Sequence, residues 1–418
     1  MNSSNLTRSS QGAGVNGKSE TTLSSEDFIR RARDIGQSLI ALQADTEERS
    51  RYSEQTHEKI KEAGLYRMLV PRRFGGYEVD IGTFMQVVVE LSACCASTGW
   101  QFALGSAHAL SVATFFPEEA QAAIFGDGHF VAASAAKPSI TATRVDGGWR
   151  LNGSVSYASG LPYSTHYMGF ALVPPEFSPT GFMTFIAPRE TWTMLEDWGD
   201  TLGLRGSGSN SVNFEDVFIP DIYVLYKNVL LESVADGTPG FALHGNPLYS
   251  GRGFSAYTFE AAAPNIGMLR AATEIYRELM LTKMTSIPPA TFRAENADFQ
   301  RYYGRILARL DAADRLFRDL CGEYTKACNR NASGEEPFDD RIDSRLAQGV
   351  AEICQICWDT MQGIILPTAG PAEFKTGKRL ERVFRDMAMA RAHVINVMFE
   401  GQNARMVAIA DLARGAAN

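Results

Sequence analysis

The sequence predicts an α+β protein in which one strand-rich segment lies between two long helical parts. Apolar residues recur every three or four positions before residue 129 and after residue 255, which is the spacing of amphipathic helices. Between residues 129 and 220 the apolar residues alternate with polar ones, as they do in half-buried strands. A chain of 418 residues is also too long for one hydrophobic core, so several domains or packed layers are expected.

Composition and charge argue against several classes of protein. The chain is 45% hydrophobic and 21% charged, which is typical of a globular protein. A net charge of −8 without a long Lys/Arg run argues against nucleic acid as a partner. No apolar run reaches the ~18 residues of a membrane span. The six cysteines lie in helical segments without other metal-ligand residues, so we expect reduced thiols, no metal site and a cytoplasmic location.

The first part of the chain is expected to be helical. Residues 1–24 are rich in Ser, Asn, Gly and Thr and are expected to form a disordered tail. Residues 25–128 are expected to form an N-terminal helical domain, with Ser24 or Ser25 as the first N-cap. Within it, residues 81–110 predict two buried helices that are unusually rich in small residues, which allow a neighbouring helix or a ligand to approach closely.

Residues 129–235 are expected to form a central β domain. Residues 145–151 predict a strand–turn–strand, in which Gly147 and Gly148 are free to adopt positive φ. A later strand ends in the tight pair Ser159-Gly160, which exposes a hydroxyl and backbone N–H groups on which a planar ligand could rest. From this segment alone, an ordinary β-turn explains the pair better, because Ser and Gly are common turn residues.

Residues 236–418 are expected to form a C-terminal helical bundle. Its four helices are predicted over 255–285, 294–330, 340–366 and 377–414, and Pro and Gly residues separate them. The last helix is expected to be continuous from residue 382 to residue 412.

Several motifs in this order of elements are similar to those of the acyl-CoA dehydrogenase superfamily. They lie in all three parts of the chain and together span most of residues 26–414. The motifs are Gly64-Leu-Tyr, Val70-Pro, Phe74-Gly-Gly, Gly148-Trp-Arg-Leu-Asn-Gly, Leu202-Gly-Leu-Arg-Gly-Ser, Val212-Asn-Phe-Glu-Asp-Val-Phe-Ile-Pro and Arg385-Asp. The resemblance implies an N-terminal α-helical domain, a central β-barrel domain and a C-terminal four-helix bundle that assembles into a homotetramer.

Two departures favour one branch of that superfamily. The dehydrogenases carry a TEPxxGSD-like segment where this chain has residues 132–139, and a QxxGGxG stretch where it has residues 366–373; neither pattern is present. The chain more closely resembles the two-component flavin-dependent monooxygenases, above all the oxygenase components of 4-hydroxyphenylacetate hydroxylases. That resemblance implies reduced flavin (FMNH2 or FADH2) from a separate reductase, O2, a C4a-hydroperoxyflavin, and hydroxylation of a small aromatic or phenolic substrate.

The same resemblance implies four catalytic residues. Ser159 matches a serine near flavin N5, and His393 matches a histidine that stabilises the hydroperoxide. His108 matches an active-site histidine, and an imidazole can accept a phenol proton. Ser134 matches a serine that forms hydrogen bonds in the same pocket. The cofactor-binding residues implied are Trp100, Ser134, Ser159, Gly160 and His393. Each of these residues also has an ordinary explanation, as a turn, strand or core residue.

Three other functions stay open. Phe399-Glu400-Gly401 resembles the segment that carries the base of acyl-CoA dehydrogenases, which makes Glu400 a candidate base. Glu400, however, lies about six residues too far beyond Arg385-Asp386 and within the helix expected to be continuous. N-oxygenation of an amino sugar uses the same fold and cofactor, but His108 favours a phenolic substrate. A flavin-binding protein without enzymatic activity would not need Ser159, His393 and His108 together.

Overall fold

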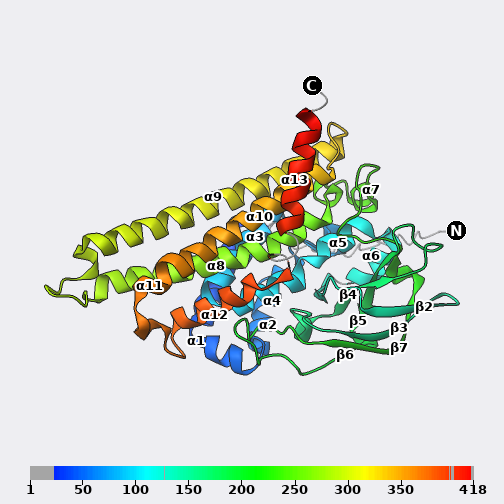
Figure 1. The fold of residues 1–418 in the computed structure, drawn as a ribbon. Helices are drawn as coiled ribbons and strands as arrows, with labels where there is room; N and C mark the ends of the chain where they lie inside the picture. The colour runs from blue at the N-terminus through cyan, green and yellow to red at the C-terminus, as the bar shows by residue number, and fades with distance from the viewer. Residues whose placement is uncertain (1–22, 127, 395, 397–399, 416–418) are drawn as a thin grey trace, which may run out of the picture.

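The computed structural model describes residues 23–415 apart from 127, 395 and 397–399. Figure 1 shows long helices forming one elongated body, with the strands gathered at one end of it. Residues 1–22 of the predicted disordered tail lie outside the described residues. Ser24 caps the first helix, because its hydroxyl accepts a hydrogen bond from Asp27 N and the Asp27 carboxylate accepts one from Ser24 N. The predicted N-cap at Ser24 is therefore confirmed.

Six helices form the N-terminal part. They are α1 (Ser25–Glu48), α2 (Glu54–Glu62), α3 (Ile81–Cys94), α4 (Ala96–Ser106), α5 (His108–Phe115) and α6 (Glu118–Phe125). Residues 81–110 thus contain two helices and the start of a third, because the chain bends again before His108. The small residues bring helices together: a Cβ on Gly99 would overlap Ser92, and a Cβ on Gly267 of the later helix α8 (Gly253–Thr282) would lie 2.5 Å from Ser92 Cβ.

Eight strands form the central sheet. They are β1 (Ala132–Ser134), β2 (Ile140–Val145), β3 (Gly148–Val155), β4 (His166–Leu172), β5 (Phe182–Pro188), β6 (Thr193–Met194), β7 (Val212–Pro220) and β8 (Val224–Leu225). The strand order is β6-β7-β3-β2-β4-β5-β8, and β1 pairs in parallel with β4. Among the described residues no ladder joins β6 to β8, so the sheet is curled rather than closed by hydrogen bonds. Its core contains large aromatic side chains such as Trp149, Tyr167 and Phe185.

The predicted strand–turn–strand is present, with one correction. Strands β2 and β3 are antiparallel, and Val145 pairs with Gly148 across the turn. Gly147 has φ +74°, but Gly148 belongs to β3 and has no positive φ. A Cβ at Gly148 would overlap the carbonyl of Ile219 on β7, so this glycine is required for close strand packing rather than for the turn.

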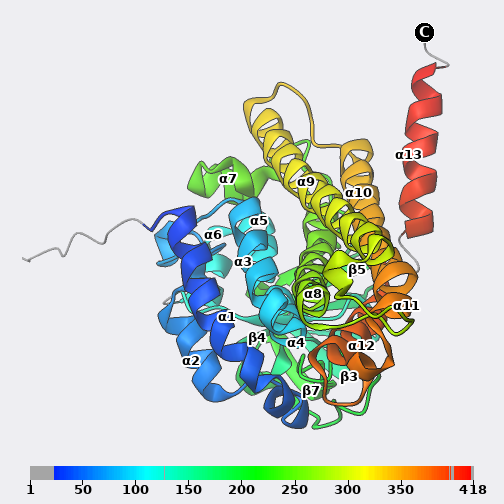
Figure 2. The same ribbon diagram turned by 90° about the vertical axis from the view of Figure 1, so that its left-hand side faces the viewer.

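The C-terminal part contains long helices and one helix that stands apart. Its elements are α7 (Pro239–His244), α8 (Gly253–Thr282), α9 (Ala297–Ser333), α10 (Asp340–Thr360), a π-helical turn (Met361–Ile365), α11 (Leu366–Ala369), α12 (Arg379–Arg391) and α13 (Glu400–Gly415). Figure 2 shows α13 beside the bundle formed by α8, α9 and α10. None of the helices in the described part is long and apolar enough to cross a membrane.

The expectation of one continuous helix from residue 382 to residue 412 is wrong. Helix α12 ends at Arg391, and α13 begins at Glu400. Asn396 stabilises the end of α12, because its side-chain amide donates to Ala390 O over 2.9 Å and its own carbonyl accepts from Arg391. The helical spacing of apolar residues continues across this break, which is why the sequence pattern does not reveal it.

Candidate active site

A cavity of about 680 Å³ lies between the sheet and the helices. This volume is within the usual range for small-molecule sites. The residues that line it come from α4, β1 and the segment after it, the turn after β3, the loop before β7, α8 and the end of α12. They are Trp100, Leu104, Ser134, Ala135, Ala136, Lys137, Ser156, Tyr157, Ser159, Trp198, Leu204, Ser207, Ser209, Tyr257, Met389, Ala392, His393 and Val394.

A chain of hydrogen bonds fixes Ser159 in the cavity wall. Trp100 Nε1 donates to Ser159 Oγ over 3.1 Å. Ser159 Oγ lies 2.7 Å from Ser209 Oγ, which in turn lies 2.7 Å from Ser207 Oγ. Each serine hydroxyl can donate or accept a hydrogen bond. If Ser209 donates to Ser159, the hydrogen of Ser159 is free to point into the cavity; if Ser159 donates to Ser209, it is not. Trp100 and Ser159, which were each predicted to bind the cofactor, are therefore in direct contact.

The turn after β3 is built by two residues with positive φ. Tyr157 has φ +67° and its side chain is 64% exposed at the cavity wall. Gly160 has φ +87°, and a Cβ there would lie 3.0 Å from Gln101 O of α4. Gly160 is not among the residues that line the cavity, so the structure explains it by close packing of the turn against α4. A direct contact between Gly160 and a cofactor stays a prediction.

His393 and Ser134 line the same cavity from different elements. His393 lies just beyond the end of α12, and its ring makes an edge contact with Trp100, with centroids 5.3 Å apart. Enclosure in the cavity wall lowers the pKa of His393 to about 4, so its imidazole is neutral at pH 7. Ser134 is the last residue of β1. The structure thus brings Trp100, Ser134, Ser159 and His393 together, although their roles remain predictions.

His108 lies in a smaller neighbouring pocket. This pocket of about 10 Å³ is lined by His108, Tyr257 and Glu260 among others, and Tyr257 also lines the large cavity. Nδ1 of His108 lies 2.7 Å from Ala132 O, so Nδ1 carries the hydrogen and donates it. Nε2 is then an acceptor, and it has no hydrogen-bond partner among the described residues. Burial lowers the pKa of His108 to about 4, so the imidazole is neutral at pH 7.

Acid is expected to destabilise the protein through His108. The pKa is near 6.5 in an unfolded chain and about 4 in the fold, so the unfolded state binds more protons as the pH falls below 6.5. The free energy of unfolding should decrease by about 2 kcal/mol between pH 6.5 and 5 from this residue. Urea titrations at both pH values should show that the free energy of unfolding decreases less for His108→Asn than for the natural chain. An equal loss in both proteins would contradict the prediction. His244→Gln serves as the comparison: burial also lowers the pKa of His244, but this residue is only half-buried, so the loss of stability should lie closer to that of the natural chain.

The loop between β6 and β7 lines the cavity and packs against α12. Leu204 and Ser207 line the cavity, and both belong to the Leu202-Gly-Leu-Arg-Gly-Ser motif. The backbone N–H of Leu204 donates to the buried carboxyl of Asp386 over 2.6 Å. Burial raises the pKa of Asp386 to about 7. A Cβ on Gly203 would overlap the carbonyl of Arg385, so only glycine lets the loop approach α12 this closely.

Several lining residues escaped the sequence analysis. Ser207 and Ser209 lie in the run Gly206-Ser-Gly-Ser-Asn-Ser, and its unusual serine content is a signal that could have identified them. Glu260 is a single acidic residue in the apolar start of α8, which is a second missed signal. Tyr257 carries no such signal, because an aromatic residue on a buried helix usually belongs to the core.

The lining fits a flavin. Hydroxyl groups occupy one part of the wall and can bond the polar edge of a flavin ring, while Trp100, Leu104 and Met389 provide apolar surface for its faces. Helix α13 begins at Glu400, whose side chain is outside the described part of the chain. In that described part, no group of three or more His, Cys, Asp or Glu could hold a metal ion.

Comparisons with known proteins agree across the chain. Acyl-CoA dehydrogenase, N-terminal domain, matches residues 22–125, and Acyl-CoA dehydrogenase, C-terminal domain, matches residues 260–398. The chain is 28% identical over 355 residues to the flavin-dependent monooxygenase oxygenase subunit HsaA of Rhodococcus jostii, covering 84% of this chain and 90% of that protein. It is 26% identical to the oxygenase component of the FADH(2)-dependent resorcinol hydroxylase of Rhizobium sp., covering 84% and 85%.

A solved structure has the same fold. XiaF from Streptomyces sp., in complex with FADH2 and glycerol, superposes with a TM-score of 0.81 and 23% sequence identity. The superposition covers 92% of this chain and 94% of XiaF. This likeness establishes the helix–sheet–helix architecture over nearly the whole chain.

Proposed function

Since the chain belongs to the acyl-CoA dehydrogenase superfamily, in its branch of two-component flavin-dependent monooxygenases, we propose that it hydroxylates a small phenolic substrate. The protein is an oxygenase component that uses reduced flavin and O2. The observation that supports a phenolic substrate is the neutral imidazole of His108. Its Nε2 is an acceptor without a partner among the described residues, in a pocket next to the cavity that Ser159 and His393 line.

The residues divide the chemical work. When bound, the reduced flavin supplies the oxygen-activating chemistry. Ser159, held by Trp100 and Ser209, presents a hydroxyl to the ring edge. His393 adds a neutral imidazole to the same wall. Apolar side chains such as Leu104 limit access of water. His108 Nε2 accepts the hydrogen of the phenolic O–H, which increases electron density on the aromatic ring.

The alternatives are less well supported. An acyl-CoA dehydrogenase would use Glu400 as its base, but the relatives named above are monooxygenases. An amine N-oxygenase needs no base that forms a phenolate, so His108 favours a phenolic substrate. A flavin-binding protein without activity would not need Ser159, His393 and His108 together.

The partners and the assembly are also proposed. Two relatives are named as oxygenase components, which supports a separate reductase that delivers reduced flavin. We expect a homotetramer, because α13 lies at the edge of the bundle and exposes Ile409 and Leu412, which are 62% and 72% exposed. The six cysteines are free and buried, which supports the cytoplasmic location that the sequence predicts.

Stopped-flow mixing tests the proposed chemistry. Anaerobic protein with reduced FMN or FAD is mixed with oxygenated buffer, and absorbance and H2O2 release are followed. We expect a transient absorbance before oxidised flavin appears, and formation of hydroxylated product when resorcinol is added. Ser159→Ala should return oxidised flavin about tenfold faster and release more H2O2, because a hydrogen bond of about 1.4 kcal/mol is lost.

Ser156→Ala is the control variant for this test. Ser156 also lines the cavity, but its hydroxyl bonds to Ser211 over 2.9 Å and is outside the Trp100–Ser159 chain. Ser156→Ala should therefore behave like the natural protein. Immediate return of oxidised flavin in the natural protein would contradict the proposal, and an acyl-CoA with an artificial electron acceptor would then be the next substrate.

A further inference from the structure

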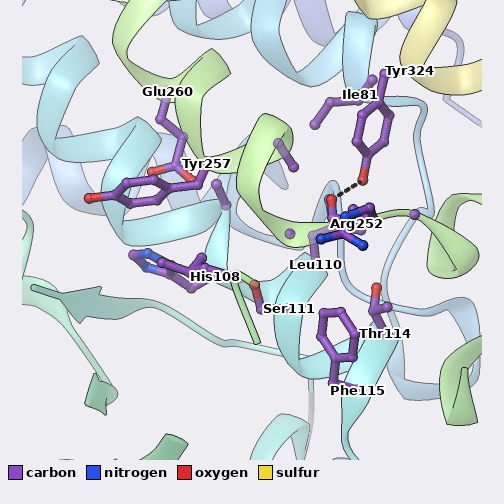
Figure 3. Close-up of a pocket in the computed structure, with 15 residues that line it drawn as sticks. Ile81, His108, Leu110, Ser111, Thr114, Phe115, Arg252, Tyr257, Glu260 and Tyr324 are labelled. Atoms are coloured by element: carbon purple, nitrogen blue, oxygen red, sulfur yellow. Dashed lines mark hydrogen bonds between the residues drawn. The ribbon is translucent and has the colours of Figure 1, made fainter. Parts of the chain in front are cut away.

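Two buried polar groups without partners face the same small pocket. Glu260 is 3% exposed and His108 is 2% exposed. Within the described part of the chain, Oε2 of Glu260 and Nε2 of His108 have no hydrogen-bond partner, and both residues line the pocket of about 10 Å³. Figure 3 shows Glu260, Tyr257 and His108 together on one side of this pocket, with Arg252 and Tyr324 on the other. An unmet buried polar group costs about 1–3 kcal/mol, so two in one pocket indicate a ligand.

The charges around Glu260 define what that ligand can be. Arg252 lines the same pocket, but its guanidinium is bound to Asp343 over 2.8 Å and to Asp340. Among the described residues no cation is therefore available to balance Glu260, and burial raises the pKa of its carboxyl well above the usual range. A neutral carboxyl has an O–H that donates and a carbonyl that accepts. It favours an uncharged hydroxyl or N–H group.

The pocket adjoins the proposed flavin cavity at Tyr257. This residue lines both spaces, and it lies three positions before Glu260 on α8, so the two side chains share one helix face. A volume of about 10 Å³ is too small for an aromatic ring. The ring of a substrate must then lie in the larger cavity, with its polar substituents directed at Glu260 and His108.

We propose that Glu260 is a specificity-determining residue that selects uncharged aromatic substrates with two hydrogen-bonding groups. A phenolic hydroxyl bonds to His108 Nε2, and a second hydroxyl or ring N–H bonds to the carboxyl of Glu260. Aromatic carboxylates are rejected, because the pocket offers them no free cation. The inference rests on the proposed function, since it assumes that the aromatic ring binds beside the flavin.

Anaerobic calorimetry tests this selectivity. Protein loaded with reduced FAD is titrated with phenol, catechol, resorcinol, hydroquinone and 4-hydroxybenzoate. We expect at least one dihydroxybenzene to bind about fivefold or more tightly than phenol, which is the usual contribution of one hydrogen bond. We expect 4-hydroxybenzoate to bind more weakly than phenol. Glu260→Met should remove the dihydroxybenzene preference, and Glu260→Gln should retain it, because an amide also donates and accepts.

Controls separate recognition from folding. Thr258→Val removes a buried hydroxyl from the same helix, one that bonds to Ser255 O over 2.8 Å and does not line either space, and it should leave the preference intact. The inference is overturned if the natural protein shows no dihydroxybenzene preference, or if Glu260→Met retains it. If Glu260→Met fails to fold, the affinities of the natural protein for phenol and the dihydroxybenzenes still test the inference. The calorimetry contains no O2 and measures binding alone. A failed hydroxylation assay in the presence of O2 would therefore refute the proposed function without changing the binding result.

Discussion

His108→Asn is expected to lower kcat for hydroxylation by about 100-fold or more, within the range of general-base contributions. The Asn amide can still donate to Ala132 O, as Nδ1 of His108 does over 2.7 Å, but the acceptor at Nε2 is lost. Oxidation of the reduced flavin in the absence of substrate should be unchanged, since His108 does not line the large cavity. Single-turnover product yield and stopped-flow absorbance measure the two quantities separately.

The pattern of effects identifies the role of His108. Ser111→Ala alters another residue of the same pocket and should leave kcat within about twofold, because its hydroxyl is not the proposed acceptor. Unchanged turnover in His108→Asn would refute the proposed role of the imidazole. A loss of substrate-free flavin chemistry as large as the loss of kcat would assign His108 to cavity packing instead.

Gly203→Ala is expected to destabilise the protein by about 3 kcal/mol and to weaken flavin binding. A Cβ at this position overlaps the backbone carbonyl of Arg385, which cannot move without shifting α12. The loop would withdraw, and the hydrogen bond from Leu204 N to Asp386 and the cavity wall at Ser207 would be disturbed. Urea unfolding and titration with reduced FAD would measure the two losses.

A glycine elsewhere provides the matched control. Gly304 lies inside α9, and a Cβ built there has no atom within 4 Å. Gly304→Ala should therefore be neutral or stabilise the protein by about 0.5–1 kcal/mol, since Ala favours the helix. If Gly203→Ala unfolds at the same urea concentration as Gly304→Ala and binds flavin normally, the close approach of loop and helix is not required.

Local features were predictable because their causes are local. The N-cap at Ser24 follows from a side chain that bonds its own helix, and the β2–β3 pair follows from alternation around Gly147. The family motifs also directed attention to Trp100 and Ser159, which lie in contact. The spacing of apolar residues could not show that α12 ends at Arg391, because the helical spacing continues across the break.

The sequence by itself determined the order helices–sheet–helices, the caps and turns, and a set of candidate residues that includes His108 and His393. The tertiary structure alone decided that His393 turns toward Trp100, that Gly160 packs against α4, and that Glu260 shares a pocket with His108. The reason is physical. A hydrogen bond between residues a few positions apart depends on the local sequence, whereas the contact between α5 and α8 depends on how the whole core packs.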